Sequence, residues 1–338
     1  MDEGSSSSWC MTPLANDAPE RVRASTERVV ADSKHVSIVD ENLEAIAEEW
    51  ALQSKAGTLF TADLGWVGCS WHYSEDAAES GPLTCQYVFV LDSLNFCFWP
   101  TDGLEYEHLA TGLRDALQRD PAALSAERLM KATPAMVQAW VPQFVMPQLE
   151  DRAAKLCELG AILHAHFGGL AANLVAAAGG SATALVSVVT ALLPAFRDES
   201  VHEGRQVFFY KRAQILAGDV WAAYGRRAPP EPFGFRDVGG LTIFADYRIP
   251  QVLASIGALS YAPALAAAVA ARRTLPAGGA EEVEIRAATV QAAERLRAAA
   301  GRRGLALLTV EVDWLLWHRG EAARETLPPH HRCLTPFY

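Results

Sequence analysis

Apolar residues recur every three or four positions along most of the chain, a spacing typical of amphipathic helices. Residues 40–55 are the clearest case, because Leu43, Ile46, Ala47 and Trp50 fall on one stripe behind an acidic first turn. Similar patterns, bounded by glycine, serine or proline signals, predict further helices. These helices are expected over residues 149–167, 181–193, 211–224, 250–256, 281–300 and 307–318.

Two segments have a strand-like pattern instead. Residues 86–99 read QYVFVLDSLNFCFW, in which β-branched and aromatic residues predict a strand or hairpin. Residues 207–210 form a second, shorter strand-like run. The fold class expected is therefore mainly α with a small β-sheet.

Residues 1–33 contain a serine run and no sustained apolar period, so we expect a disordered tail there and a single domain over 34–338. Residues 168–196 carry no charge and are long enough to cross a bilayer. However, Asn173 interrupts this run, and Gly179, Gly180 and Ser181 look like a helix stop followed by a new cap. Two buried helices are favoured over a membrane span.

Composition narrows the class of function. The chain has 338 residues, of which 50% are hydrophobic and 20% charged, and its formal net charge is −11. Such an acidic protein repels phosphate backbones, so we expect no direct DNA or tRNA binding. The six cysteines form no CxxC pair, which favours reduced thiols and a cytoplasmic location. Without nucleotide-loop or metal-ligand motifs, we expect no metal and no cofactor.

Two carboxylates lie inside apolar runs, Asp246 in LTIFADYRIP and Asp313 in LLTVEVDWLLW. Burying an unpaired carboxylate costs several kcal/mol. Each is therefore either paired in a structural ion pair, for which Arg248 and Arg286 are available, or functional. The neighbouring Phe244 and Trp314 would supply flat faces for a heterocyclic base, although aromatic residues are core residues by default.

Two adjacent cations, Lys211 and Arg212, follow the apolar run VFFY. They could hold a single phosphate group. The alternative is a surface pair whose aliphatic stems cover apolar neighbours.

Several strings taken together resemble the queuosine salvage proteins, which are queuosine 5′-phosphate N-glycosidases. The most specific are LNFCFW, YKRAQIL and FADYR, and matching segments, DWLLW among them, run in order from about residue 34 to HRCLTPFY at 331–338. The resemblance implies a mostly helical fold related to helix-hairpin-helix DNA glycosylases, without their DNA-binding groove. It also implies hydrolysis of queuosine 5′-phosphate to queuine and ribose 5-phosphate, so that queuine returns to tRNA.

Carried over by position, the resemblance makes Phe244 and Asp246 one base-binding pair and Asp313 and Trp314 a second pair. His72 corresponds to an amino-terminal pocket histidine. Members of the family often have an acidic residue just after the LW of DWLLW, where this chain has His318. If that acid is catalytic, this chain has either lost it or uses Asp313 in its place, and we count His318 among the substrate-binding residues.

These roles suggest a mechanism. Cleavage of the ribosyl bond develops positive charge at C1′, which a carboxylate stabilises, and we assign this role to Asp313. Asp246, the second candidate catalytic residue, would hold the guanine-like edge, while Lys211 and Arg212 would bind the 5′-phosphate.

Three alternatives remain open at this point. They are a non-catalytic queuine carrier with the same pocket, a helical interaction protein with structural carboxylates, and a DNA glycosylase. The last is disfavoured by the net charge.

Overall fold

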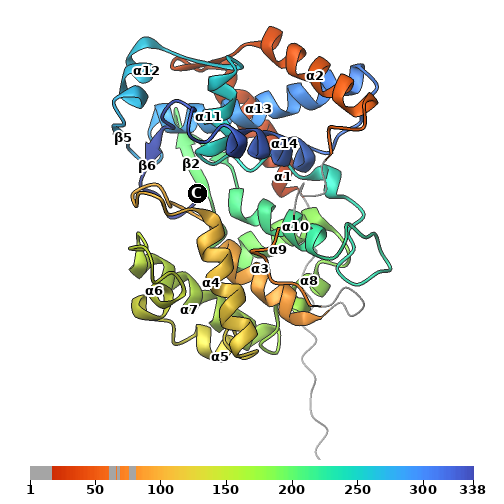
Figure 1. Ribbon diagram of the computed structural model, residues 1–338, viewed down its shortest axis with the longest axis vertical. Helices are drawn as coiled ribbons and strands as arrows, with labels where there is room; N and C mark the ends of the chain where they lie inside the picture. The colour runs from red at the N-terminus through yellow and green to blue at the C-terminus, as the bar shows by residue number, and fades with distance from the viewer. Residues whose placement is uncertain (1–16, 61–65, 67–68, 76–80) are drawn as a thin grey trace, which may run out of the picture.

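The computed structural model describes residues 17–60, 66, 69–75 and 81–338. Helices dominate these ranges (Figure 1), which confirms the mainly α class. The α-helices are α1 (Ala18–Ala31), α2 (Asp40–Lys55), α3 (Pro82–Leu94), α4 (Tyr106–Arg119), α5 (Ala126–Leu129), α6 (Pro134–Trp140), α7 (Leu149–His166), α8 (Ala171–Ala177), α9 (Ala182–Leu192), α10 (Lys211–Ala223), α11 (Arg248–Ser255), α12 (Pro263–Ala270), α13 (Ala280–Arg302) and α14 (Thr309–Ala322).

The strands in the described ranges form three separate two-stranded pairs rather than one sheet. Two pairs are antiparallel and one is parallel. They are β1 (Val36–Ile38) with β4 (Leu259–Tyr261), β2 (Glu199–His202) with β3 (Arg205–Phe208), and the parallel pair β5 (Thr274–Leu275) with β6 (Arg332–Cys333).

The strand predicted over residues 86–99 is wrong, because residues 82–94 form helix α3. Pro82 occupies its first turn, where a missing N–H costs nothing, and every residue from 84 to 94 is buried. A helix buried on all sides shows no polar face, so its sequence lacks the helical period. Helix α3 contacts α4, α7, α8 and α10 in the interior.

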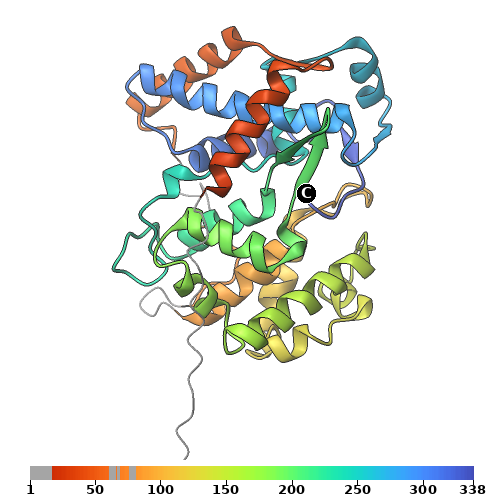
Figure 2. The same ribbon diagram turned by 180° about the vertical axis from the view of Figure 1, so that it is seen from behind.

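The disordered tail predicted for residues 1–33 is also corrected where the structure describes it. Residues 18–31 form α1, which packs on α13 and β3 (Figure 2). Val22 and Val29 are buried, and the Arg23 guanidinium donates to the Gly240 and Leu241 carbonyls, both at 2.8 Å. The Thr26 hydroxyl donates to the Val22 carbonyl, so this polar residue can be buried in the packed face of α1. A polar residue in the buried face interrupts the apolar pattern by which the helix would have been predicted. Residues 1–16 of the predicted tail lie outside the described part of the chain.

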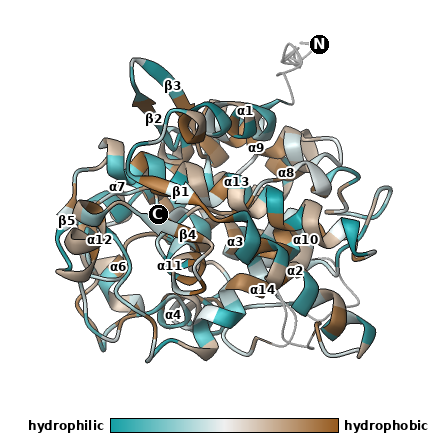
Figure 3. Ribbon diagram, turned by 90° about the horizontal axis from the view of Figure 1, so that it is seen from above, coloured by the Kyte–Doolittle hydropathy of each residue, from teal (hydrophilic) through white to brown (hydrophobic). Residues whose placement is uncertain are grey.

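The amphipathic helices predicted from sequence are confirmed with small shifts at their ends. Ser181 accepts a hydrogen bond from the Ala184 amide and begins α9, as its sequence indicated. Most helices carry both hydrophobic and hydrophilic stretches (Figure 3), as expected for helices that pack around a shared core. Helices α2, α11, α13 and α14 pack together in the upper half of Figure 1, and α3 with its neighbours fills the lower half.

The uncharged run at 168–196 folds as α8, a break and α9, as predicted. Within the described ranges, no single helix has both the length and the apolar character needed to cross a membrane. The helix pair α7 and α8, bent by 66°, passes that test together on length and composition alone.

Candidate active site

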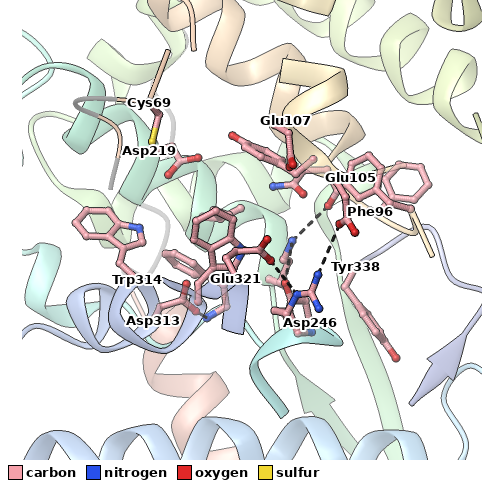
Figure 4. A pocket seen from close by; sticks show the side chains of 18 of the residues that line it. Cys69, Phe96, Glu105, Glu107, Asp219, Asp246, Asp313, Trp314, Glu321 and Tyr338 are labelled. Atoms are coloured by element: carbon pink, nitrogen blue, oxygen red, sulfur yellow. Dashed lines mark hydrogen bonds and ion pairs between the residues drawn. The ribbon is translucent and has the colours of Figure 1, made fainter. Parts of the chain in front are cut away.

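A deep cavity lies between α10, α14, the α3–α4 connection and the segment that precedes α11 (Figure 4). Its empty space is about 980 Å³, including the part open to solvent. The wall is mostly aromatic, with several acidic groups. The lining residues are Trp66, Cys69, Trp71, His72, Asn95, Phe96, Phe98, Glu105, Tyr106, Glu107, Lys211, Ile215, Asp219, Phe244, Asp246, Tyr247, Arg248, Asp313, Trp314, Trp317, His318, Glu321 and Tyr338.

One face of α10 forms a wall of this cavity. Lys211, Ile215 and Asp219 follow one another at intervals of four residues, which places them on the same side of a helix. At 1.5 Å per residue, Lys211 and Asp219 are separated by about 12 Å along the helix axis. The cavity therefore has a lysine toward one end of this wall and a carboxyl group toward the other.

Asp246 lies at the lysine end. Its Oδ1 accepts hydrogen bonds from the amides of Arg248, at 2.8 Å, and Ile249, at 3.1 Å, which fixes the start of α11. Its Oδ2 is 4.0 Å from the Lys211 Nζ. One carboxylate oxygen is thus held by the backbone, and the other remains available to a ligand in the cavity.

Asp313 projects from α14 toward the same segment. Its Oδ1 accepts a hydrogen bond from the Phe244 amide at 3.1 Å, so the two sequence-predicted carboxyl groups converge on one site. Burial raises the pKa of Asp313 well above its usual value, and the nearby charge of Asp246 raises it further. Burial therefore favours the neutral form of this acid.

Phe244 and Trp314 supply the flat faces predicted for this site. The Phe244 ring lies against α10 at Gly218, where an added Cβ would be 3.0 Å from the ring. A glycine at this position therefore lets the ring approach the helix. Trp314 is nearly parallel to Trp221, with ring centroids 6.3 Å apart, and this stacking fixes the plane of the indole.

His72 also lines the cavity, as predicted. Its ring stacks on Trp66 with centroids 3.7 Å apart, and its Nε2 is 3.0 Å from the Tyr106 hydroxyl. Burial lowers the pKa of His72 to about 4, so the imidazole is neutral at pH 7. A neutral ring held this way can contribute shape and a hydrogen bond, but not positive charge.

The structure separates the two predicted phosphate ligands. Lys211 lines the cavity, and its Nζ donates to the Asn95 carbonyl at 3.3 Å. Arg212 is buried elsewhere, where it donates to the carbonyls of Ser93, at 2.6 Å, and Ala195. This corrects the assignment of Arg212 as a substrate ligand, because adjacent helical residues point to different faces.

The mouth of the cavity carries a charged network that the sequence analysis missed. Arg248 lies 3.1 Å from Glu321 and 3.6 Å from Glu105, and all three residues line the cavity. His318 lies on this rim as well. The carboxyl group of Asp219 was also missed, although its run AQILAGDVWA has the same pattern of an acid among apolar residues that singled out Asp246 and Asp313.

Metal binding has no candidate in the part of the chain that the structure describes, since no group of three His, Cys, Asp or Glu side chains is placed to share an ion. The cavity instead has flat apolar walls and a few convergent acids. That combination defines a site for a planar heterocyclic small molecule with hydrogen-bond donors.

Comparison with known proteins agrees with this class of site. The family model described as queuosine salvage protein matches residues 72–338. A queuosine 5′-phosphate N-glycosylase/hydrolase from Dictyostelium discoideum is 39% identical over 94% of this chain and 98% of its own length. The protein of the same name from Sphaerobacter thermophilus is 39% identical over 94% and 97%, and that from Mus musculus is 29% identical over 89% and 96%. The chain belongs to the queuosine salvage protein family.

Proposed function

We propose that this protein hydrolyses the N-glycosidic bond of queuosine 5′-phosphate and releases queuine and ribose 5-phosphate. The observation that carries the proposal is the convergence of Asp246 and Asp313 on one ring-lined cavity. The relatives that cover nearly the whole chain bear the name of this activity.

The Phe244–Asp246 segment recognises the base. The free Oδ2 of Asp246 accepts the N–H donors on the pyrimidine edge of the 7-deazaguanine, while Phe244 and Trp314 bound the flat ring. The Lys211 Nζ lies 4.0 Å from that oxygen and places a positive charge beside it. A half-buried acceptor beside a cation selects ligands that present N–H groups, because other edges would leave this acceptor unpaired.

Asp313 assists cleavage of the glycosidic bond by stabilising the charge that develops on the sugar. As the C1′–N9 bond breaks, positive charge develops at C1′ and the ring oxygen, and an opposite charge favours the ionised carboxylate over the neutral acid. The hydroxyl of water ends on C1′, and its proton ends on the departing nitrogen. A 7-deazapurine has no N7 to protonate, so stabilisation of the sugar cation has to provide much of the rate enhancement.

Incubation with queuosine 5′-phosphate, followed by mass detection of free queuine and ribose 5-phosphate, tests the proposal. Asp313→Asn serves as the matched variant. If the wild-type protein binds the nucleotide but releases no queuine, the proposal fails and the carrier function, with the same pocket, takes its place.

The wider expectations belong to this proposal too. They are a cytoplasmic enzyme in which the described residues from 18 to 338 form one domain, since α1 packs on α13. This enzyme acts on a free nucleotide and binds no DNA, tRNA or membrane directly. They also include a fold related to helix-hairpin-helix DNA glycosylases without the groove. The net charge of −11 supports the missing groove.

A further inference from the structure

Asp219 differs from the other two aspartates of the cavity. Asp246 and Asp313 each accept backbone hydrogen bonds. The Asp219 side chain is only 8% exposed, lines the cavity (Figure 4), and makes no hydrogen bond or ion pair with any residue that the structure describes. Its carboxyl group lies in the cavity wall without a protein donor, where a ligand that enters the cavity can supply one.

The surroundings of Asp219 are rich in acids and poor in cations. Burial raises the pKa of Asp219, the charges of Asp92 and Asp313 raise it further, and Lys211 opposes them. Asp92 is itself fully buried and its Oδ2 has no hydrogen-bond partner among the described residues. A cationic ligand group would meet favourable potential here, and an anionic one would be repelled.

The distance along α10 fits a particular ligand geometry. Lys211 lies beside Asp246, and Asp219 lies about two turns further along α10, about 12 Å away in axial rise. A 7-deazaguanine whose pyrimidine edge meets Asp246 can therefore direct its opposite side, which carries C7, toward the Asp219 end of this wall.

We infer that Asp219 binds the protonated amine on the C7 branch of the substrate and thereby selects 7-aminomethyl-substituted bases. The inference rests on the proposed function for the identity of the base. Asp246 reads the pyrimidine edge, Asp219 pairs with the ammonium, and Asp313 faces the sugar between them. Pairing with the ligand cation satisfies the carboxyl group that the protein leaves without a donor.

Calorimetric titration with two free bases, 7-aminomethyl-7-deazaguanine and 7-deazaguanine, tests this assignment. The wild-type protein should bind the aminomethyl base at least about tenfold more tightly. Asp219→Asn should remove that preference and leave the affinity for 7-deazaguanine unchanged. Asp219→Ala provides a second variant with the same expected loss, and Asp102→Asn, at an exposed position away from the cavity, is the matched control.

An equal loss for both bases in Asp219→Asn would overturn the inference, as would a wild-type protein that binds them equally. The kinetic counterpart compares queuosine 5′-phosphate with 7-deazaguanosine 5′-phosphate, and only the former should depend on Asp219 through kcat/KM. A wild-type protein that prefers the aminomethyl base but hydrolyses neither nucleotide would defeat the proposed function while leaving this assignment standing.

Discussion

Two groups of charged side chains contact the Phe244–Asp246 segment, and they are built differently. In the first, Arg286 donates to both carboxylate oxygens of Asp198, at 2.8 and 2.5 Å, and to the Ala245 carbonyl at 2.9 Å. Glu282 lies 3.6 Å away and accepts from the Tyr338 hydroxyl at 2.8 Å. Every charged group in this cluster has a partner.

The second group is the set of cavity carboxyls Asp219, Asp246 and Asp313, with Lys211 as the cation beside Asp246. Here the donors come from backbone amides or are missing, and burial raises the pKa of Asp219 and Asp313 well above the usual value. The contrast separates structure from function. The paired Arg286 cluster has a structural role. The cavity carboxyls lack side-chain partners, and a ligand can supply the missing cation and hydrogen-bond donors.

The largest effect is expected at Asp313. Asp313→Asn keeps the shape of the side chain but removes the negative charge, so kcat should fall by several orders of magnitude while the melting temperature stays within a few degrees. Steady-state hydrolysis of queuosine 5′-phosphate and a thermal melt measure the two effects. A variant with near-normal turnover would remove Asp313 from the chemistry.

A substitution at Arg286 should instead lower stability. Arg286→Met leaves Asp198 and Glu282 buried without their cation, which should cost about 3–5 kcal/mol of unfolding free energy. The control is Arg295→Met, since the Arg295–Asp40 pair has exposures of 43% and 62% and should be worth less than about 1 kcal/mol. Urea unfolding compares them, and equal losses would contradict the view of the Arg286 cluster as a structural core.

Lys211 tests where the 5′-phosphate binds. Lys211→Ala should raise KM about tenfold or more for queuosine 5′-phosphate and for the unphosphorylated nucleoside alike, because the Lys211 Nζ lies 4.0 Å from the Asp246 oxygen assigned to the base. Kinetics on both substrates give the answer. A rise confined to the phosphorylated substrate would assign Lys211 to the 5′-phosphate instead.

The smallest effect is expected for Asp219→Asn, on the free energy of unfolding. Because the pKa of Asp219 is raised, the folded state holds a proton that the unfolded state has released above about pH 4, so this group destabilises the fold increasingly as pH rises. Asp219→Asn should therefore gain about 1 kcal/mol at pH 7 and less at pH 5. Denaturant melts at both values measure it, and a gain independent of pH would reject the titration of Asp219 as its source.

Sequence reasoning succeeded where the physical signal is local. Helices α2, α7, α9 and α13 have an apolar stripe and clear ends, and each was found. Asp246 and Asp313 stood out because a carboxylate inside an apolar run requires an explanation.

It failed where tertiary packing decides. Helix α3 is buried on all sides, so its sequence has no helical period of apolar and polar residues. Helix α1 buries two polar residues, Ser25 and Thr26, in its packed face, which disguises its apolar stripe in the sequence. Arg212 illustrates a further limit, since two adjacent cations look alike in the sequence but leave a helix in different directions. Trp66 and Tyr106 reach the cavity from distant segments that no local pattern connects.

The cavity draws its walls from residue 66 to residue 338, with Asp313 and Trp314 supplied by α14, near the end of that span. During synthesis, the Phe244–Asp246 segment assigned to the base emerges from the ribosome before Asp313, the group assigned to stabilising the sugar cation. A nascent chain stopped short of α14 would thus present an incomplete cleft with no means of catalysis, and turnover would begin only after the carboxyl-terminal helix had docked.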